Sequence, residues 1–233
     1  MSITKMLVAW IENYDSQQSL GSKLRAKRIA PLLDMIESIF NKHGSVNIID
    51  IGGTESYWGI VPKQFLDDHH ITITIVNLPR LEVKQDHGHF KFVGADACTL
   101  EGFSDQSFHI AHSNSVVEHV GDWERMMQFA KEISRVSQAY FVQTPNYWFP
   151  VEPHCMAPFF HWLPKQSRIW LVSHFQLGNR SKAASMDEAE RLVESVHLLD
   201  RERFQELFKD AHVLTEWFFC LPKSFIALKK VNA

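Results

Sequence analysis

Short apolar runs alternate with longer amphipathic segments along the first two thirds of the chain. Five runs rich in branched and aromatic residues predict strands at residues 46–51, 71–76, 90–93, 108–111 and 139–142. The first run has apolar residues on consecutive positions, which indicates a strand buried on both faces. Strands that alternate with helical segments predict a parallel sheet with helices on both faces.

The helical segments between these runs have recognisable ends. Pro31 suits the first turn of a helix or a kink, and Gly44 is the expected stop of the same helix. Asp122 and Asp200 are expected to cap two later helices, because an N-cap carboxylate accepts hydrogen bonds from free backbone amides. A capping box at 185–188 predicts the start of a further helix.

The last two apolar runs, 212–219 and 224–230, are joined by a short connection at 221–223. A connection of this length cannot cross over a sheet, so we expect an antiparallel hairpin. The predicted fold is therefore α/β, with a seven-stranded, mostly parallel sheet that ends in an antiparallel hairpin. We expect residues 1–233 to form a single domain, with residues 1–44 as an N-terminal helical cap.

The stretch from Asn146 to Ser185 interrupts the alternation of strands and helices. It holds four Pro, three Trp and several Phe and His, so it is too apolar to be disordered and too long for a plain loop. We expect residues 146–185 to form a lid insertion with helical and aromatic character; the alternative is an irregular helix pair that completes the core. Its aromatic side chains either line an apolar pocket or pack together: Tyr147, Trp148, Phe149, Phe159, Phe160 and Trp162.

The amino-acid composition argues against several functional classes of protein. Twenty-four Lys and Arg stand against 27 Asp and Glu, and this balance argues against a nucleic-acid binder. The chain has no uncharged apolar run long enough to span a bilayer and no convincing signal peptide. Cys98, Cys155 and Cys220 are far apart and form no paired motif, which favours a reducing compartment. We expect a cytoplasmic enzyme without a membrane or nucleic-acid partner; its oligomeric state stays open.

A turn of small residues follows the first predicted strand, at Gly52 and Gly53. Such a turn lets the backbone approach a ligand at the carboxyl end of a sheet. The dinucleotide fingerprint fails here because its third glycine falls on Ser56 or Tyr57, and a phosphate-binding P-loop fails because no Gly-Lys-Ser/Thr follows. Asp50 would repel a pyrophosphate but attract an amino group. This disfavours a nicotinamide dehydrogenase.

Five segments, in order and spacing, resemble the class I S-adenosylmethionine-dependent methyltransferases. The first follows their pattern acidic-x-Gly-x-Gly-x-Gly, with Asp50 and Gly52 retained and with Thr54 and Ser56 at the later glycines. The segments that follow the second and third strands also correspond, although Asn77 stands where the family usually has an acid. Residues 108–120 and 140–146 look like the large small-molecule branch known as type 11, with His109 in place of the usual Asp. The resemblance covers about residues 20–230.

The resemblance implies a Rossmann-like sheet and S-adenosyl-L-methionine as the cofactor. In the family, the residue after the second strand holds the ribose hydroxyls, and the acid after the third strand meets the adenine amino group. By this correspondence the cofactor-binding residues are Asp50, Gly52, Gly53, Thr54, Asn77, Leu78, Asp96, Ala97, Ser113 and Asn114.

The resemblance implies methyl transfer to a small-molecule acceptor in a biosynthetic pathway, with the acceptor atom left open among O, N and C. The chain lacks the Asn/Asp-Pro-Pro-Tyr/Phe motif of base and glutamine methyltransferases, since Ser113-Asn114-Ser115-Val116 stands there. Two alternatives stay open. One is a lyase or cyclase that acts on the aminobutyrate arm and releases methylthioadenosine; the other is a catalytically silent cofactor-binding subunit.

Three residues are candidates for catalysis: His119 just after the fourth strand, and Asn146 and His154 in the lid insertion. A histidine there can act as a base or orient the acceptor. The competing interpretation is that these side chains pack or cap. Glu152 lies two residues before His154, and an extended stretch would bring the two together.

No metal is expected, because polar residues within an aromatic patch such as Glu152, His154 and His161 more often satisfy the backbone. The basic residues within 23–28 are expected to form a solvated helix face. The alternative is that one of them meets an anionic substrate or the cofactor carboxylate.

Overall fold

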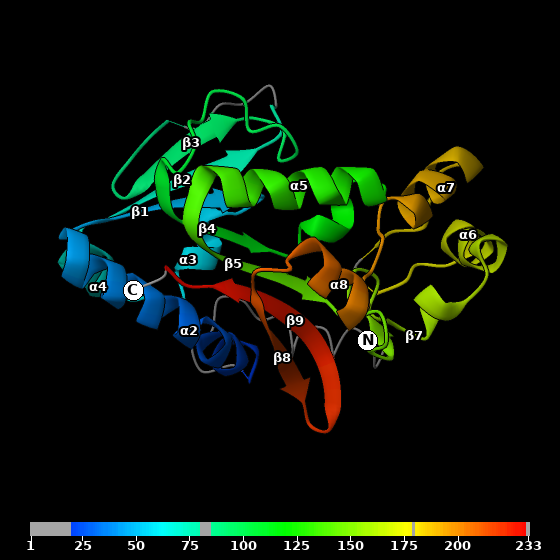
Figure 1. Cartoon of the computed structure of the whole chain (residues 1–233). Coiled ribbons are helices and arrows are strands. Elements are labelled where there is room, and N and C mark those ends of the chain that lie inside the picture. Colours follow the sequence, from blue (N-terminus) through cyan, green and yellow to red (C-terminus); the bar gives the residue numbers. More distant parts are fainter. Residues whose placement is uncertain (1–19, 80–84, 179, 232–233) are drawn as a thin grey trace.

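A twisted seven-stranded sheet forms the centre of the computed structural model, which describes residues 20–79, 85–178 and 180–231 (Figure 1). The strand order is β3-β2-β1-β4-β5-β9-β8, and β9 is antiparallel to both of its neighbours. The chain order reverses between β1 and β4, where ligands of open α/β sheets bind. The strands are β1 (Val46–Ile51), β2 (Ile71–Asn77), β3 (Phe90–Gly94), β4 (Phe108–Asn114), β5 (Ser137–Pro145), β8 (His212–Phe218) and β9 (Leu221–Lys229).

The predicted fold class is confirmed, with differences at the strand ends. β4 and β5 are longer than expected, and β5 begins at Ser137, directly after a helix that ends at Val136. The expected hairpin connection at 221–223 was wrong, because β9 already begins at Leu221 and the turn is made by the two residues before it. Pro222 fits because it pairs with β8 beside an irregularity in the register.

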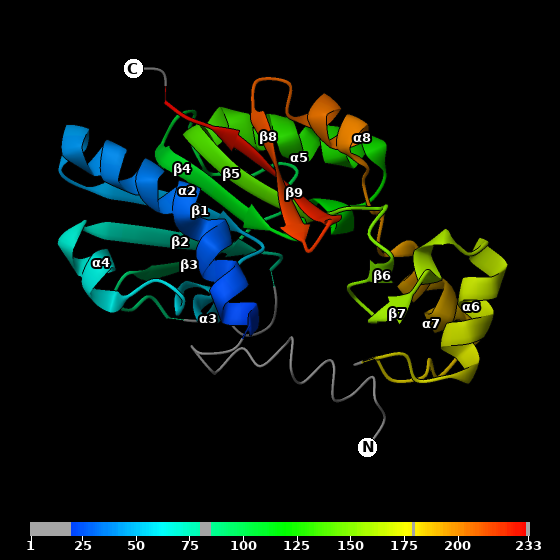
Figure 2. The ribbon, with the colours of Figure 1, turned by 90° about the horizontal axis from the view of Figure 1, so that it is seen from below.

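Helices cover both faces of the sheet, as Figures 1 and 2 show. On one face lie α2 (Leu20–His43), α3 (Glu55–Trp58) and α4 (Lys63–Asp68); on the other lie α5 (Trp123–Val136) and α8 (Arg201–Leu207). Adjacent residues of β1 serve the two cores, because Ile48 packs with Leu32 and Ile36 of α2 whereas Ile49 packs with Phe129 and Phe204.

The capping predictions are confirmed for three helices. The side chains of Asp122 and Asp200 accept the backbone amides of Arg125 and Arg203 at the starts of α5 and α8. The capping box is also present at the start of α7 (Met186–Glu194). Pro31 lies inside α2 and not at its start, and Gly44 ends that helix with a φ of 74°. None of the helices in the described ranges is long and apolar enough to cross a bilayer.

The segment after β5 folds into a small unit beside the sheet, toward which the arrows of β4 and β5 point in Figure 2. We call it the lid unit and define it as residues 146–194. It contains the paired strands β6 (Val151–Glu152) and β7 (Ala157–Pro158), the short helix η2 (Phe160–Trp162), α6 (Lys165–His174) and α7. These elements share a core of their own that includes Cys155, Ile169 and Val193. The helix pair α6–α7 therefore packs on a separate core, and the unit extends past the expected boundary at Ser185.

Candidate functional site

The glycine turn after β1 lies at the switch point of the sheet and is held by its neighbours. The side-chain amide of Asn77, at the end of β2, donates to the carbonyl of Gly53 at 3.0 Å. Gly52 has a φ of 72°, and the Val116 side chain occupies the space that a β-carbon would need. At Gly53 the same space is filled by the carboxylate of Asp50. Both glycines are therefore required by close packing within the chain itself.

Asp50 does not present its carboxylate at the surface, contrary to the expectation from the sequence. It has no exposed area, and its oxygens accept from the Trp58 indole at 2.8 Å and from Nδ1 of His112 at 2.6 Å. The other ring nitrogen of His112 lies 3.2 Å from the hydroxyl of Tyr57. This network was missed from the sequence, although a histidine inside an apolar strand was a signal for it. We infer that the buried Asp50 carboxylate stabilises the turn from the core side.

The remaining residues that were expected to bind the cofactor differ in their solvent exposure. Leu78 is 62% exposed beside the exposed Asn77. Ser113 is buried and donates to the carbonyl of Ile51, so its side chain ties β4 to β1. The other expected cofactor-binding residues lie at the same end of the sheet and are partly or fully exposed: Gly52, Gly53, Thr54, Asp96, Ala97 and Asn114.

Asp96 already has partners. Its carboxylate accepts the Cys98 amide at 2.9 Å and makes two contacts with a guanidinium nitrogen of Arg125, at 2.9 and 3.0 Å. The Cys98 amide and the Arg125 guanidinium together hold the pKa of this carboxyl below its usual value. An ionised carboxylate has about four acceptor positions, so one further donor can still be accepted.

One residue of the basic run is not on a solvated face, which corrects the expectation for Arg28. Its guanidinium lies 3.2 Å from the Glu216 carboxylate and donates to Asn114 at 2.9 Å. Both side chains of the ion pair are nearly buried. Arg28 therefore reaches the carboxyl end of β4, beside the expected cofactor residues, but its charge is balanced by Glu216.

A chain of polar side chains links the end of β4 to the lid unit. Nε2 of His119 lies 2.8 Å from Nε2 of His154, and Nδ1 of His154 lies 2.6 Å from the carboxylate of Glu152. Nδ1 of His119 is 3.0 Å from the carbonyl of Ser195. The structure thus brings together the expected pair Glu152 and His154, and adds His119 to it. His161 is not part of the chain, because its Nε2 contacts the carbonyl of Tyr147.

The pKa values of two carboxyl groups beside these histidines are shifted in opposite directions. Glu118 has no exposed area, and burial raises its pKa to about 7 although Thr144 donates to its Oε2. Burial alone would also raise the pKa of Glu152, but the hydrogen bonds from His154 and Cys155 outweigh it and lower the pKa to about 2. Glu152 is therefore an ionised anchor for His154 near neutral pH.

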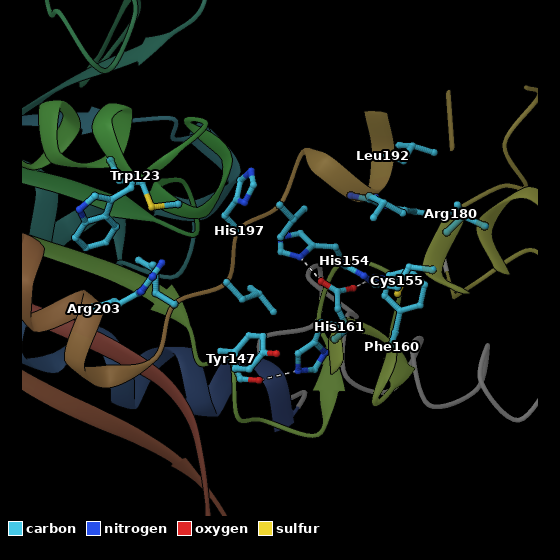
Figure 3. Close-up of a pocket in the computed structure, with 18 residues that line it drawn as sticks. Trp123, Tyr147, His154, Cys155, Phe160, His161, Arg180, Leu192, His197 and Arg203 are labelled. Carbon is cyan, nitrogen blue, oxygen red and sulfur yellow. Dashed lines mark hydrogen bonds and ion pairs between the residues drawn. The ribbon is translucent and has the colours of Figure 1, made fainter. Parts of the chain in front are cut away.

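A cavity of about 290 Å³ lies between the lid unit and the helices α5 and α8, and Figure 3 shows its lining. Its polar lining combines three arginines and three histidines with Glu152 as the carboxylate: Arg168, Arg180, Arg203, His154, His161 and His197. Trp123, Tyr147 and Phe160 add aromatic surface. Of the six lid aromatics expected either to line a pocket or to pack together, Tyr147 and Phe160 line this cavity. The arginines were missed because they are scattered over the lid unit and α8, with no spacing that marks them.

Asn146 holds the root of the lid unit. It is buried, its side-chain nitrogen donates to the carbonyl of Pro222 at 2.7 Å, and its oxygen accepts the Trp148 amide at 3.0 Å. The expected position, with the amide directed into a crevice, is replaced by these two backbone partners. The backbone amide of the next residue, Tyr147, donates to the carbonyl of Leu199, so the start of the lid unit is tied to the segment that follows it.

Val116 connects the glycine turn to the cavity. Its side chain packs against Gly52, and Glu118 and His119 follow two and three positions later in the short helix η1 (Val117–His119). The backbone carbonyl of Glu118 accepts the amide of the cavity residue His197. The carboxyl end of β4 thus touches the turn on one side and the cavity on the other.

The chain is similar to known proteins in part of its sequence and in its fold. A family model described as a methyltransferase domain matches residues 59–139, and no curated protein matches the chain. A structure described as a zinc-dependent alcohol dehydrogenase from Rhodobacter sphaeroides is 12% identical, with a TM-score of 0.50 over 91% of this chain and 98% of that chain. At this identity the similarity shows a shared fold alone.

Two methyltransferase structures are also similar. For an S-adenosylmethionine-dependent methyltransferase from Methanosarcina mazei the identity is 16% and the TM-score 0.47, over 83% of this chain and 98% of that chain. For an O-methyltransferase family protein from Burkholderia thailandensis the values are 13% and 0.47, over 91% of this chain and 59% of that chain.

The sheet order and the glycine turn at its switch point are those expected for the Rossmann-like fold of the class I methyltransferases. The family match identifies residues 59–139 as a methyltransferase domain of the type 11 branch that the sequence resembled. S-adenosylmethionine is therefore the cofactor. The chain has groups that fit it, because exposed Leu78 offers an apolar surface and the neighbouring Asn77 offers a polar edge beside the turn. The matched range begins after the turn and ends before the lid unit, so the family match does not describe the acceptor site.

Proposed function

We propose that this enzyme methylates a small anionic acceptor, which binds in the cavity between the lid unit and α8. The observation that carries the proposal is the cationic lining. The buried Nε of Arg168 has no hydrogen-bond partner among the described residues, and Arg180 and Arg203 line the same space. A carboxylate or phosphate can satisfy such groups with charge-assisted hydrogen bonds. The volume is near the lower end of small-molecule pockets, which are roughly 300–1,000 Å³.

The cofactor and the acceptor are proposed to bind in two different regions, the glycine turn and the cavity. We propose that the turn at Gly52 and Gly53, with Asn77 and Leu78, holds S-adenosylmethionine, which supplies an already activated methyl group when bound. The other expected cofactor residues support this region, with Asp50 and Ser113 acting from behind. Catalysis then depends mainly on placing the acceptor atom in line and excluding water.

His119 and His154 are proposed to contact the acceptor at the cavity edge nearest β4. His154 is fixed by Glu152, so its Nε2 has a defined direction toward His119. Asn146 acts as a positioning residue, because its hydrogen bonds hold the lid root against β9. The free thiols of Cys98, Cys155 and Cys220 support the expected cytoplasmic location, and we propose a biosynthetic role.

The acceptor class can be tested without knowing the acceptor. Extract from the source cells is separated into macromolecules and small molecules, and the small molecules are divided on an anion exchanger. Each fraction is incubated with the enzyme and S-adenosylmethionine, and S-adenosylhomocysteine is measured by chromatography. We expect activity in the retained small-molecule fraction. Activity only in the unretained or macromolecular fraction contradicts the proposal, and methylthioadenosine as the product indicates a lyase.

A matched pair of variants links that activity to the cavity. Arg168→Gln removes the guanidinium whose buried Nε has no partner among the described residues, whereas Arg191→Gln changes an arginine of α7 that does not line the cavity. We expect Arg168→Gln to raise KM for the active fraction at least about tenfold, because charge-assisted bonds contribute about 1.5–3 kcal/mol. Arg191→Gln should leave KM within about twofold. Equal changes in KM for the two variants would show that the acceptor does not bind in this cavity.

A further inference from the structure

The two facing histidines have protonation states that their partners dictate. Nδ1 of His119 lies 3.0 Å from the carbonyl of Ser195, and Nδ1 of His154 lies 2.6 Å from the carboxylate of Glu152. A carbonyl and an ionised carboxylate only accept hydrogen bonds, so both Nδ1 atoms must carry hydrogen. In neutral rings both Nε2 atoms then carry a lone pair. These two nitrogens face one another at 2.8 Å.

Two lone pairs at this distance repel each other unless a positive species lies between or beside them. A third acceptor group lies close to the two rings. One carboxylate oxygen of Glu118 and one ring nitrogen each of His119 and His154 lie within 4.8 Å of one another. Oε1 of Glu118 is buried and has no hydrogen-bond partner among the described residues. A buried carboxylate oxygen without a donor is costly, so a cation held between these three side chains would stabilise it.

We propose that Glu118, His119 and His154 bind a divalent metal ion of the zinc class. Two imidazoles and one carboxylate are a ligand set that zinc uses when a fourth position is kept open. The surroundings also match, because a histidine ligand usually donates its other N–H to a carboxylate or a carbonyl, as both do here. This site was not expected from the sequence, which offered Glu152, His154 and His161 as the stronger cluster.

Metal binding requires a small movement of the two rings. Nitrogen ligands about 2.0–2.1 Å from zinc at a tetrahedral angle lie roughly 3.3 Å apart, so the rings must separate by about half an ångström. His119 is exposed and can make this adjustment. The positive charge of Arg180 lowers the pKa of His119, whereas the carboxylate of Glu152 acts on that pKa in the opposite direction.

The site deepens the proposed function, on which this further role rests. His154 lines the cavity, so the open position of the metal faces the space proposed for the acceptor. An anionic oxygen of the acceptor would then be a metal ligand. The other way to relieve the repulsion is a proton shared by His119 and His154, with one ring as an imidazolium.

Calorimetric titration of the chelator-treated full chain with zinc chloride, without cofactor or acceptor, tests the site directly. We expect one ion per chain. His119→Ala and His154→Ala should each weaken binding by at least about 10²-fold, and Glu152→Gln by about 10- to 100-fold because it orients His154. His197→Ala is the matched control, since it lines the same cavity outside the ligand cluster, and should stay within about threefold.

The outcomes separate this site from the methyl-transfer proposal. Absence of zinc binding by the wild-type chain overturns the metal site and favours the shared proton, while methyl transfer to an anion can still be correct. Zinc binding that persists in both His119→Ala and His154→Ala also overturns it, because the ion then lies elsewhere. Circular dichroism checks that each variant is folded; where His154→Ala unfolds, Glu118→Gln is used, with the same loss expected.

Discussion

Asp50 of β1 and His112 of β4 are register partners in adjacent parallel strands, and their side chains meet at 2.6 Å between Oδ1 and Nδ1. Neither side chain has more than 1% of its area exposed. The pair lies directly behind Gly53, whose missing β-carbon makes room for the carboxylate. The strand pairing therefore builds a buried polar support beneath the turn that approaches the cofactor.

Removal of His112 should leave this carboxylate underpaired in the core. We expect His112→Ala to lower the free energy of unfolding by about 3–5 kcal/mol, because an uncompensated buried charge is costly. His112→Asn, whose amide can still donate, should lose less. Urea unfolding of both variants gives the comparison. A loss below about 1 kcal/mol for His112→Ala would mean that Asp50 finds another partner.

The second prediction concerns Gly52, in the turn that the sequence predicted to approach a ligand closely. Gly44 has nearly the same φ, 74° against 72°, but nothing within 4 Å of its β-carbon position. Both substitutions to Ala carry the left-handed strain of about 1–2 kcal/mol. Gly52→Ala should lose about 1–3 kcal/mol more, because it also overlaps Val116. Equal losses in urea unfolding would remove the packing argument.

Much of the fold was predictable because the hydrophobic pattern and the caps are local signals. The doubly buried β1 and the carboxylate caps at Asp122 and Asp200 were found from neighbouring residues alone. α6 was not predicted, since its amphipathic pattern is weak and its burial depends on α7. The hairpin turn was misplaced because Pro222 suggested a break, whereas the irregular register beside it accepts a proline.

The site was less predictable, because its contacts join distant parts of the chain. Glu152 and His154 were paired from their spacing of two residues, and the structure places them in contact. No local pattern could bring His119 to His154, which lies 35 residues away and in another unit. Asp50 was interpreted as a ligand group because its buried partner His112 belongs to a strand 62 residues later.

A third prediction concerns Asn77, which stands where related enzymes usually have an acid. Its amide donates to the carbonyl of Gly53, and a carboxylate would instead place an acceptor against that oxygen. We expect Asn77→Asp to weaken S-adenosylhomocysteine binding by up to about tenfold, since one hydrogen bond contributes roughly 0.5–1.5 kcal/mol to the turn. Calorimetry measures the affinity. Tighter binding by Asn77→Asp would show that the charge on the ribose matters more than the turn.

The fourth prediction is a loss of stability in mild acid caused by His109. Burial and the nearby His43, whose ring stacks on it, hold the pKa of His109 below its ordinary value of 6.5. Its Nδ1 accepts the backbone amide of Asn47, which only an unprotonated nitrogen can do. Because the folded pKa is depressed, this contribution is complete above pH 6.5 and is lost as the pH falls from 6.5 toward the folded pKa.

The variant His109→Asp provides the comparison for that pH effect, since a carboxylate still accepts from Asn47 in mild acid. Urea midpoints are measured about one pH unit above and about one below 6.5 for both proteins. The wild type should lose more stability between the two conditions, and the difference between proteins cancels the titration of the other histidines. The same loss of stability in both proteins would show that groups other than His109 cause the acid sensitivity.

The last prediction concerns the role of His154 in turnover. His154 lies between the ionised Glu152 and His119 at the edge of the cationic cavity, and the cofactor residues lie across Val116 at the glycine turn. Truncation to Ala should therefore lower kcat by roughly 10²-fold or more, whether the ring orients the acceptor directly or through a bound ion, because positioning and acid–base effects are of that size. S-adenosylhomocysteine affinity should stay within about threefold, since His154 is not part of the turn. If the ring only fills space in the lid unit, the variant instead melts at a lower temperature with turnover per folded molecule unchanged, and measuring both quantities on the same preparation decides between the two roles.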